Sequence, residues 1–212
     1  MKLNDKAEGD YIQDFVGPLG KATETDGIKK VCIVGGGVGC AIAMPVAQEF
    51  KRLGAEVTSI IGFRNKDIVI LEDEFRACSD KLVVMTDDGS YGAHGNVTVP
   101  LKEMLAGGER FDMIITIGPL IMMKFVTLTA KEFNVPCTVS MNPIMIDGTG
   151  MCGGCRLTLN QNGTRVTKFA CVDGPDFNGY EVDFDEAMSR GATYADFERQ
   201  AREEYCNLFK KA

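Results

Sequence analysis

The sequence has little that could serve in acid–base catalysis. Its single histidine, His94, lies in a polar, glycine-rich loop, where an ordinary exposed side chain is the simplest interpretation. No other residue has the pattern of a general acid or base. The sequence therefore gives no support for a function centred on proton transfer by side chains.

Positive charge and long apolar runs are also scarce. The 30 acidic residues outnumber the 23 basic ones, and the net charge of -7 argues against nucleic acid or an anionic membrane as a partner. Glycines interrupt the apolar stretch over residues 31–47, and the N-terminus has no apolar signal core. We expect a cytoplasmic protein.

The eight cysteines fall into two groups. Disulfides are rare in the cytoplasm, so clustered cysteines there indicate metal binding or redox chemistry. Isolated cysteines in apolar or mixed surroundings are expected to be inert packing residues, and these are Cys32, Cys40, Cys78, Cys137 and Cys206. The clustered ones are Cys152, Cys155 and Cys171, with glycines at 148, 150, 153 and 154.

Apolar segments with strand and helix periodicity alternate along the chain. This alternation predicts an α/β fold with a doubly wound, mostly parallel sheet. Residues 142–183 interrupt it with many glycines and the clustered cysteines. The expected strands cover 29–36, 56–63, 81–88, 111–119 and 135–141, and the expected helices cover 45–55, 97–108, 120–134 and 184–206.

A glycine-rich turn, GGGVG at 35–39, follows the first expected strand. Glycines in this place let backbone N–H groups approach a pyrophosphate, which we expect near Gly36, Gly37 and Gly39. The spacing is not a full G-x-G-x-x-G, so a tight structural turn is the alternative.

Two more strand ends carry turn residues. Gly118 and Pro119 precede Met122, whose alternative interpretation is core filling, and Asp88 lies in a segment that could equally be a cap and turn. Since the carboxyl ends of parallel strands meet at one edge of a sheet, the three segments together predict a ligand cleft.

Three cysteines leave the clustered site one ligand short of the usual four. The residues alone leave a thiol–disulfide centre, a zinc site completed by Asp147, a structural turn and an iron–sulfur site open.

Several motifs together resemble one family. IIGFRNKDIVILEDE, TDDGSYGAHG, TIGPLIMMK and SMNPIMIDGTGMCGGC are similar to the ferredoxin-NADP reductase superfamily, in the branch with a C-terminal 2Fe-2S module. That branch contains the electron-transfer subunit of dihydroorotate dehydrogenase and the small subunit of NADH-dependent ferredoxin:NADP oxidoreductase, also called sulfide dehydrogenase. The resemblance runs from residue 9 to about residue 185.

The resemblance implies a complete set of cluster ligands. Aspartate at position 147, where other members have cysteine, is the pattern of the ferredoxin:NADP oxidoreductase small subunits. A carboxylate carries the same single charge as a thiolate but is a harder ligand. The implied ligands are Asp147, Cys152, Cys155 and Cys171.

The resemblance also implies the nucleotide chemistry. NAD(H), with NADP possible, would lie across the strand ends with its nicotinamide near Gly118 and Pro119, and Asp88 and Met122 would line the site. Arg64 would contact the adenosine ribose or a 2′-phosphate, although a plain surface arginine is equally compatible. Hydride transfer to FAD needs no acid or base, and FAD would pass single electrons to the cluster.

The resemblance further implies a division of the chain and a partner. The partner would be a large flavin and iron–sulfur subunit, with ferredoxin engaged indirectly; the alternatives are a dihydroorotate dehydrogenase electron-transfer subunit and a metal-stabilised nucleotide-binding regulator. Most of the family's flavin barrel has no counterpart here, so we expect a truncated form or half of a split protein, inactive alone. The expected parts are a barrel remnant and linker at 1–26, an NAD(P)-binding domain at 27–141, an iron–sulfur module at 142–183 and a helical segment at 184–212.

The C-terminal helix has an apolar stripe with charged residues between. We expect it to pack on its own domain, with partner binding as the alternative. The stripe consists of Phe184, Met188, Tyr194, Phe197, Ala201 and Tyr205.

Overall fold

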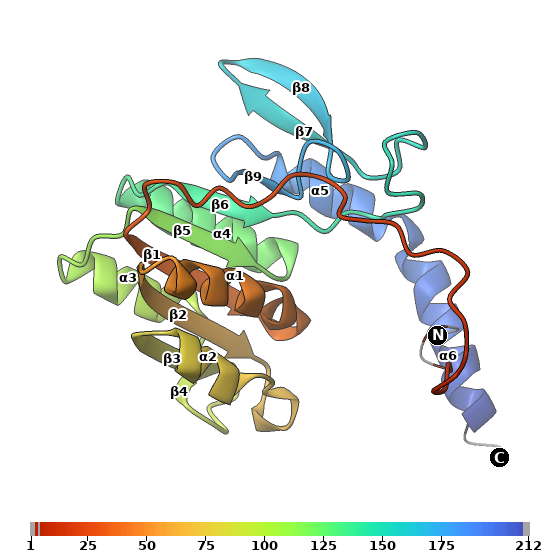
Figure 1. Ribbon diagram of the computed structural model, residues 1–212, viewed down its shortest axis with the longest axis horizontal. Helices are drawn as coiled ribbons and strands as arrows, with labels where there is room; N and C mark the ends of the chain where they lie inside the picture. Colours follow the sequence, from red (N-terminus) through yellow and green to blue (C-terminus); the bar gives the residue numbers. More distant parts are fainter. Residues whose placement is uncertain (1–2, 4, 210–212) are drawn as a thin grey trace.

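A computed structural model of the chain describes residue 3 and residues 5–209, with side chains described up to residue 203. Its centre is a twisted sheet whose strands are parallel except for β9 (Figure 1). Within the described residues the sheet has the order β4 (Ala93–His94), β3 (Lys81–Thr86), β2 (Glu56–Phe63), β1 (Lys30–Gly36), β5 (Met113–Ile117), β6 (Cys137–Ser140) and β9 (Asp176–Asn178).

The central strands are apolar on both faces, as buried parallel strands must be. In β1, Val31 and Ile33 enter one hydrophobic cluster and Cys32 and Val34 enter the other. Helices α1 (Cys40–Arg52) and α2 (Glu72–Cys78) supply residues to the first cluster, and α3 (Thr98–Ala106) and α4 (Leu120–Glu132) to the second. The doubly wound, mostly parallel sheet expected from the sequence is confirmed.

Each expected strand is present, but the first helix begins earlier than expected. The sequence pattern placed its start at Pro45, whereas α1 begins at Cys40, directly after the 3-10 turn η1 (Gly37–Gly39). Pro45 lies inside the helix and costs it one backbone hydrogen bond. Burial of Cys40, Ala43 and Ala47 against the sheet outweighs that loss.

A hairpin, β7 (Arg156–Gln161) and β8 (Thr164–Phe169), occupies the glycine-rich region and was not expected. Its outer strand projects beyond the β9 side of the sheet (Figure 1), while β7 bonds to the segment before α5 (Phe184–Gly191). Asn160 N–H donates to the Glu181 carbonyl at 2.7 Å, and Asp183 N–H donates to the Thr158 carbonyl at 3.0 Å. These bonds fix the hairpin to the body of the protein.

The C-terminal region is two helices rather than the single one expected. After α5 the chain passes through η3 (Ala192–Tyr194) into α6 (Ala195–Phe209), which extends away from the sheet in Figure 1. Phe184, the first residue of α5, is buried, but the side chains of Tyr194 and Phe197 are 54% and 72% exposed. The expectation that the whole stripe packs on its own domain is therefore wrong, because only its α5 part reaches the core; Tyr205 lies outside the described side chains.

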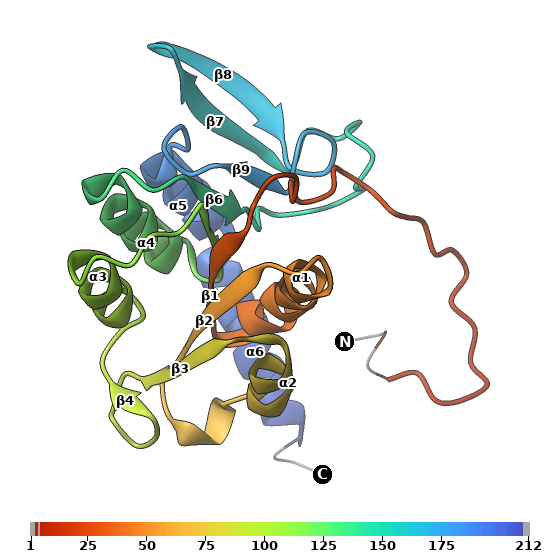
Figure 2. The same ribbon diagram turned by 60° about the vertical axis from the view of Figure 1, so that its left-hand side comes forward.

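None of the helices in the described part of the chain is both long enough and apolar enough to cross a membrane. The short element η2 (Lys66–Ile68) precedes α2, and β4 lies at the far edge of the sheet. Figure 2 shows both near the end of β3.

Candidate functional site

Two glycine-containing turns meet at the carboxyl ends of β1 and β5. These strands are neighbours, and the chain continues from them to opposite sides of the sheet, so the edge between them is a topological switch point. A Cβ built on Gly118 would lie 3.1 Å from the Gly36 Cα, and one on Gly39 would lie 2.7 Å from the Gly118 Cα. The two predicted segments are thus in direct backbone contact.

The same edge carries the N-termini of α1 and α4. Each helix has 13 residues, and neither N-terminus has a side-chain cap or an acidic residue in its first turn. Uncapped N–H groups and the helix dipole both favour an anion at this position. The edge is therefore suited to a pyrophosphate.

Met122 has a structural role at this edge. Its side chain fills the space beside Gly36 and Gly118, where a Cβ on either glycine would collide with it. Pro119 is exposed and Gly118 is buried. The methionine side chain therefore packs against both turns.

Arg64 and Asp88 lie at the same edge, after β2 and β3. Both side chains are exposed, and Asp88 N–H donates to the Arg64 carbonyl at 3.2 Å. The Asp88 carboxylate accepts hydrogen bonds from the Ser90 hydroxyl at 2.6 Å and the Ser90 N–H at 2.9 Å, and these bonds lower its pKa. The structure brings together the strand ends that the sequence predicted, and Asp88 closes a turn there; His94 is exposed, as expected.

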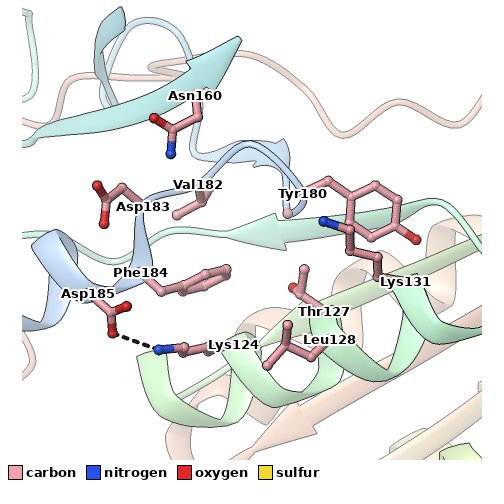
Figure 3. Close-up of a pocket in the computed structure, with 11 residues that line it drawn as sticks. Lys124, Thr127, Leu128, Lys131, Asn160, Tyr180, Val182, Asp183, Phe184 and Asp185 are labelled. Carbon is pink, nitrogen blue, oxygen red and sulfur yellow. Dashed lines mark hydrogen bonds and ion pairs between the residues drawn. The ribbon is translucent and has the colours of Figure 1, made fainter. Parts of the chain in front are cut away.

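Two cavities lie away from this edge. One of about 280 Å³ lies between α4 and the segment leading into α5, with the Lys124–Asp185 ion pair at one side (Figure 3). The other, of about 470 Å³, lies near the start of β6. Neither contains a residue predicted to bind nucleotide or metal.

The clustered cysteines lie where the loop after β6 meets the open end of the hairpin. Cys155 precedes β7 and Cys171 follows β8, and their sulfur atoms are 3.3 Å apart. Both residues are buried, whereas Cys152 is exposed and its sulfur accepts the Gly154 N–H at 3.3 Å.

Asp147 is held by its own loop. Its carboxylate accepts the Thr149 N–H at 2.7 Å and the Cys152 N–H at 2.7 Å, and these donors lower its pKa. Burial raises the pKa of Cys171, and the neighbouring Cys155 thiol and the Asp147 charge add to that effect. Among the described residues no group of three such side chains is closed around a common point.

The donor set nevertheless suits an iron–sulfur cluster. Three thiols and one carboxylate gather at the end of a hairpin, and thiolates are the usual ligands of iron in such clusters. Thr149, which sequence reasoning missed, is signalled by the D-x-T spacing typical of a side-chain turn.

The other described cysteines are packing residues, as expected. Burial raises the pKa of Cys40 and of Cys137 to about 12 and also raises those of Cys32 and Cys78. Such thiols are poor nucleophiles and poor metal ligands. The side chain of Cys206 lies outside the described residues.

The chain is similar to known proteins over most of its length. Residues 142–183 match the iron–sulfur cluster binding domain of dihydroorotate dehydrogenase B. A Thermotoga maritima protein, a homologue of the dihydroorotate dehydrogenase B (NAD(+)) electron transfer subunit, is 48% identical over 96% of this chain and 70% of its own length. A probable subunit of the same kind from Methanocaldococcus jannaschii is 42% identical over 86% of this chain and 67% of its own.

A solved structure has the same fold over almost the whole chain. It is that of an NADH-dependent reduced ferredoxin-NADP oxidoreductase, described for flavin-based electron bifurcation. The match has a TM-score of 0.84 and 48% identity and covers 97% of this chain and 72% of the other.

Proposed function

Since the chain belongs to the family of dihydroorotate dehydrogenase B electron transfer subunits and their homologues, we propose that it is the electron-transfer subunit of an NADH-dependent oxidoreductase of the ferredoxin:NADP type. Electron transfer through a bound iron–sulfur cluster is the role that the matched segment supports. The division of the chain into a barrel remnant, an NAD(P)-binding domain, an iron–sulfur module and a helical segment remains a prediction.

The observation that carries the proposal is that the four candidate ligands form two contacting pairs within one matched segment. Asp147 is bonded to the backbone of Cys152, and Cys155 contacts Cys171, all within the segment that matches the iron–sulfur domain. We propose that these four residues hold a 2Fe-2S cluster. The single negative charge of the carboxylate would leave the cluster charge equal to that of a four-cysteine site.

The nucleotide would bind at the carboxyl edge of the sheet. The N-terminus of α1, with Gly36, Gly37 and Gly39, would accept the pyrophosphate, and the turn at Gly118 and Pro119 would accept the nicotinamide. Arg64 and Asp88, at the ends of β2 and β3, would border the adenosine ribose. We propose NAD(H) as the nucleotide, with NADP as the alternative.

When bound, FAD exchanges a hydride for single electrons and a 2Fe-2S cluster carries single electrons. This chain's residues would orient the nicotinamide at the turn of Gly118 and Pro119 and hold the cluster ligands at the end of the hairpin. The described residues form one sheet and one hairpin, with no flavin-binding barrel, so we infer that the 212 residues do not complete the reaction alone.

We propose that the partner is a larger subunit with further flavin and iron–sulfur centres, and that ferredoxin exchanges electrons with that subunit. Asp147 favours this assignment over a dihydroorotate dehydrogenase subunit, whose pattern has cysteine at the first ligand position. Relatives of this chain are named for dihydroorotate dehydrogenase, so the role of electron-transfer subunit of that enzyme is the alternative.

The test is the metal content and spectra of anaerobically purified protein. The proposal predicts about two irons per chain and a dithionite-reduced EPR signal that changes in Asp147→Cys. Asp67→Cys, at an exposed aspartate of η2, is the matched control and should leave the signal unchanged. Zinc would contradict the electron-transfer assignment and favour the metal-stabilised regulator. No metal after anaerobic reconstitution would contradict both and would mean that the turn is structural or redox-active as a thiol.

A further inference from the structure

The four candidate ligands differ in burial and in the hydrogen bonds that they make. Cys155 donates its thiol hydrogen to the Cys171 sulfur at 3.3 Å, and the two residues are only 2% and 6% exposed. Cys152 is exposed and bonds to its own turn through Gly154 N–H. The site thus consists of a buried thiol pair and an exposed loop.

The buried pair is positioned by backbone hydrogen bonding that needs no metal. The ladder of β7 and β8 runs from the Gln161 and Thr164 pair to the Arg156 and Phe169 pair. One step further, Ala170 N–H donates to the Cys155 carbonyl at 3.2 Å. The register of the hairpin therefore places the two sulfur atoms next to each other.

Asp147 and Cys152 belong to a different unit. The carboxylate accepts N–H groups from Thr149 and Cys152, so the loop closes on itself. The sulfur atoms of the free thiols Cys155 and Cys171 are already 3.3 Å apart, so a disulfide between them needs only a short further approach.

We propose that Cys155 and Cys171 are a specific oxidation site of the metal-free chain, where hydrogen peroxide produces an intrachain disulfide that excludes iron. One thiol is oxidised by peroxide to a sulfenic acid with release of water. The other sulfur then attacks it and forms the S–S bond, and a second water leaves. Two thiols lose two electrons in total, and one peroxide is reduced to two waters.

Exclusion of iron follows from the bonding of the two sulfurs. Metal ligation needs thiolates, and a disulfide removes two of the four ligands at once. This part of the inference rests on the proposed function, since it takes both cysteines as cluster ligands. The disulfide itself depends only on the hairpin geometry.

The experiment treats the reduced, metal-free full chain with one equivalent of hydrogen peroxide, blocks the remaining thiols and digests with trypsin. The expected product links the peptides 132–156 and 169–190, which carry Cys155 and Cys171. The first peptide also contains Cys137 and Cys152, so fragmentation must place the bond. Cys152→Ser should retain the link, and Cys171→Ser should abolish it.

The second readout is iron uptake during anaerobic reconstitution with ferrous iron and sulfide. We expect about tenfold less iron in the oxidised chain than in the reduced chain, with recovery after dithiothreitol. A link that involves Cys152 or Cys137, or that disappears in Cys152→Ser, would overturn the proposed pair. Equal iron uptake by reduced and oxidised chains would overturn the exclusion of iron.

The two proposals fail in different ways. If the reduced chain takes up no iron while the Cys155–Cys171 link still forms, the proposed cluster function is wrong and the pair remains a thiol modification site. If the reduced chain takes up iron and no link forms, the cluster function stands and the oxidation site is wrong.

Discussion

Gly39 at the start of α1 lies directly against the Ile117 carbonyl at the end of β5, so that a Cβ at position 39 would be 2.6 Å from that oxygen. Both partners are backbone, and neither can move aside as a flexible side chain can. The contact joins the turn after one strand to the turn after its neighbour. At the proposed nucleotide site, this contact would limit how closely a ligand can approach both turns.

Gly39→Ala should therefore lower the free energy of unfolding by about 1–3 kcal/mol, as overpacking does, and should weaken NADH binding. Urea unfolding and calorimetric titration with NADH measure the two effects. Gly191→Ala is the matched control, since nothing lies within 4 Å of a Cβ there. Equal stability and affinity in the two variants would show that the contact at Gly39 is not restrictive.

Two phenylalanines of the C-terminal region differ in how far they are buried. Phe184 is 7% exposed and Phe197 is 72% exposed. Phe184→Ala should cost about 3–5 kcal/mol of unfolding free energy, whereas Phe197→Ala should change it by no more than about 0.5 kcal/mol. Thermal or urea unfolding of the isolated chain compares them, and a large effect of Phe197→Ala would mean that α6 packs on its own domain in solution.

Asp112 links two strands of the sheet through the backbone. Its carboxylate accepts the N–H groups of Lys29 and Lys30, both at 2.8 Å, and these bonds lower its pKa. A pKa that is lower in the folded chain gives stability that is fully present above the unfolded value of about 3.9 and is lost as pH falls through the folded value.

Asp112→Ala should therefore reduce stability at pH 7 and reduce the loss of stability below about pH 4. Urea unfolding over a pH series tests this, with Asp26→Ala, at an exposed aspartate, as control. Parallel pH profiles for wild type and Asp112→Ala would contradict the prediction.

Thr149 is the positioning residue of Asp147. Its N–H and its hydroxyl donate to one carboxylate oxygen, at 2.7 and 3.3 Å. In the proposed cluster, loss of the hydroxyl would make the Asp147 carboxylate a stronger electron donor to iron, so the reduction potential should be lower in Thr149→Val than in Thr149→Ser. Redox titration followed by EPR measures both, and the difference should vanish when Asp147 is also replaced by cysteine.

The sequence predicted β1, β2, β3, β5 and β6 because each contains an apolar run, but it missed the short strands β4 and β9 of the same sheet. It missed α2, which has seven residues and begins after Leu71, a residue with a left-handed φ of 59° and no capping side chain. Tertiary contacts of Phe75 and Cys78 hold that helix, and local pattern does not report them.

The hairpin could have been found. Asn162 and Gly163, with φ of 51° and 80°, form the two-residue turn that Asn-Gly favours. The glycines and cysteines around it obscured this signal. The point at which the C-terminal stripe leaves the core was harder to predict. The amphipathic pattern continues from α5 into η3, whereas the packing of the stripe against the core ends at α5.

The candidate ligands illustrate a similar division. Spacing and resemblance together named the four residues, but the contact between Cys155 and Cys171 depends on the β7–β8 register. The turn around Asp88 was foreseen as one possibility, while its bonds to Ser90 required the structure.

The excursion that carries the cysteines leaves the sheet after Ser140 and returns at Asp176, and these two residues are paired in the antiparallel register of β6 and β9. Met141 N–H also donates to the Pro175 carbonyl at 2.9 Å, so both ends of the excursion are anchored at one place. A carrier domain on a single tether must swing between donor and acceptor, and its rate then varies with solvent viscosity. Here both ends of the segment that carries the cysteines are fixed to the sheet, so we expect electron transfer through these cysteines to have a rate that does not vary with solvent viscosity.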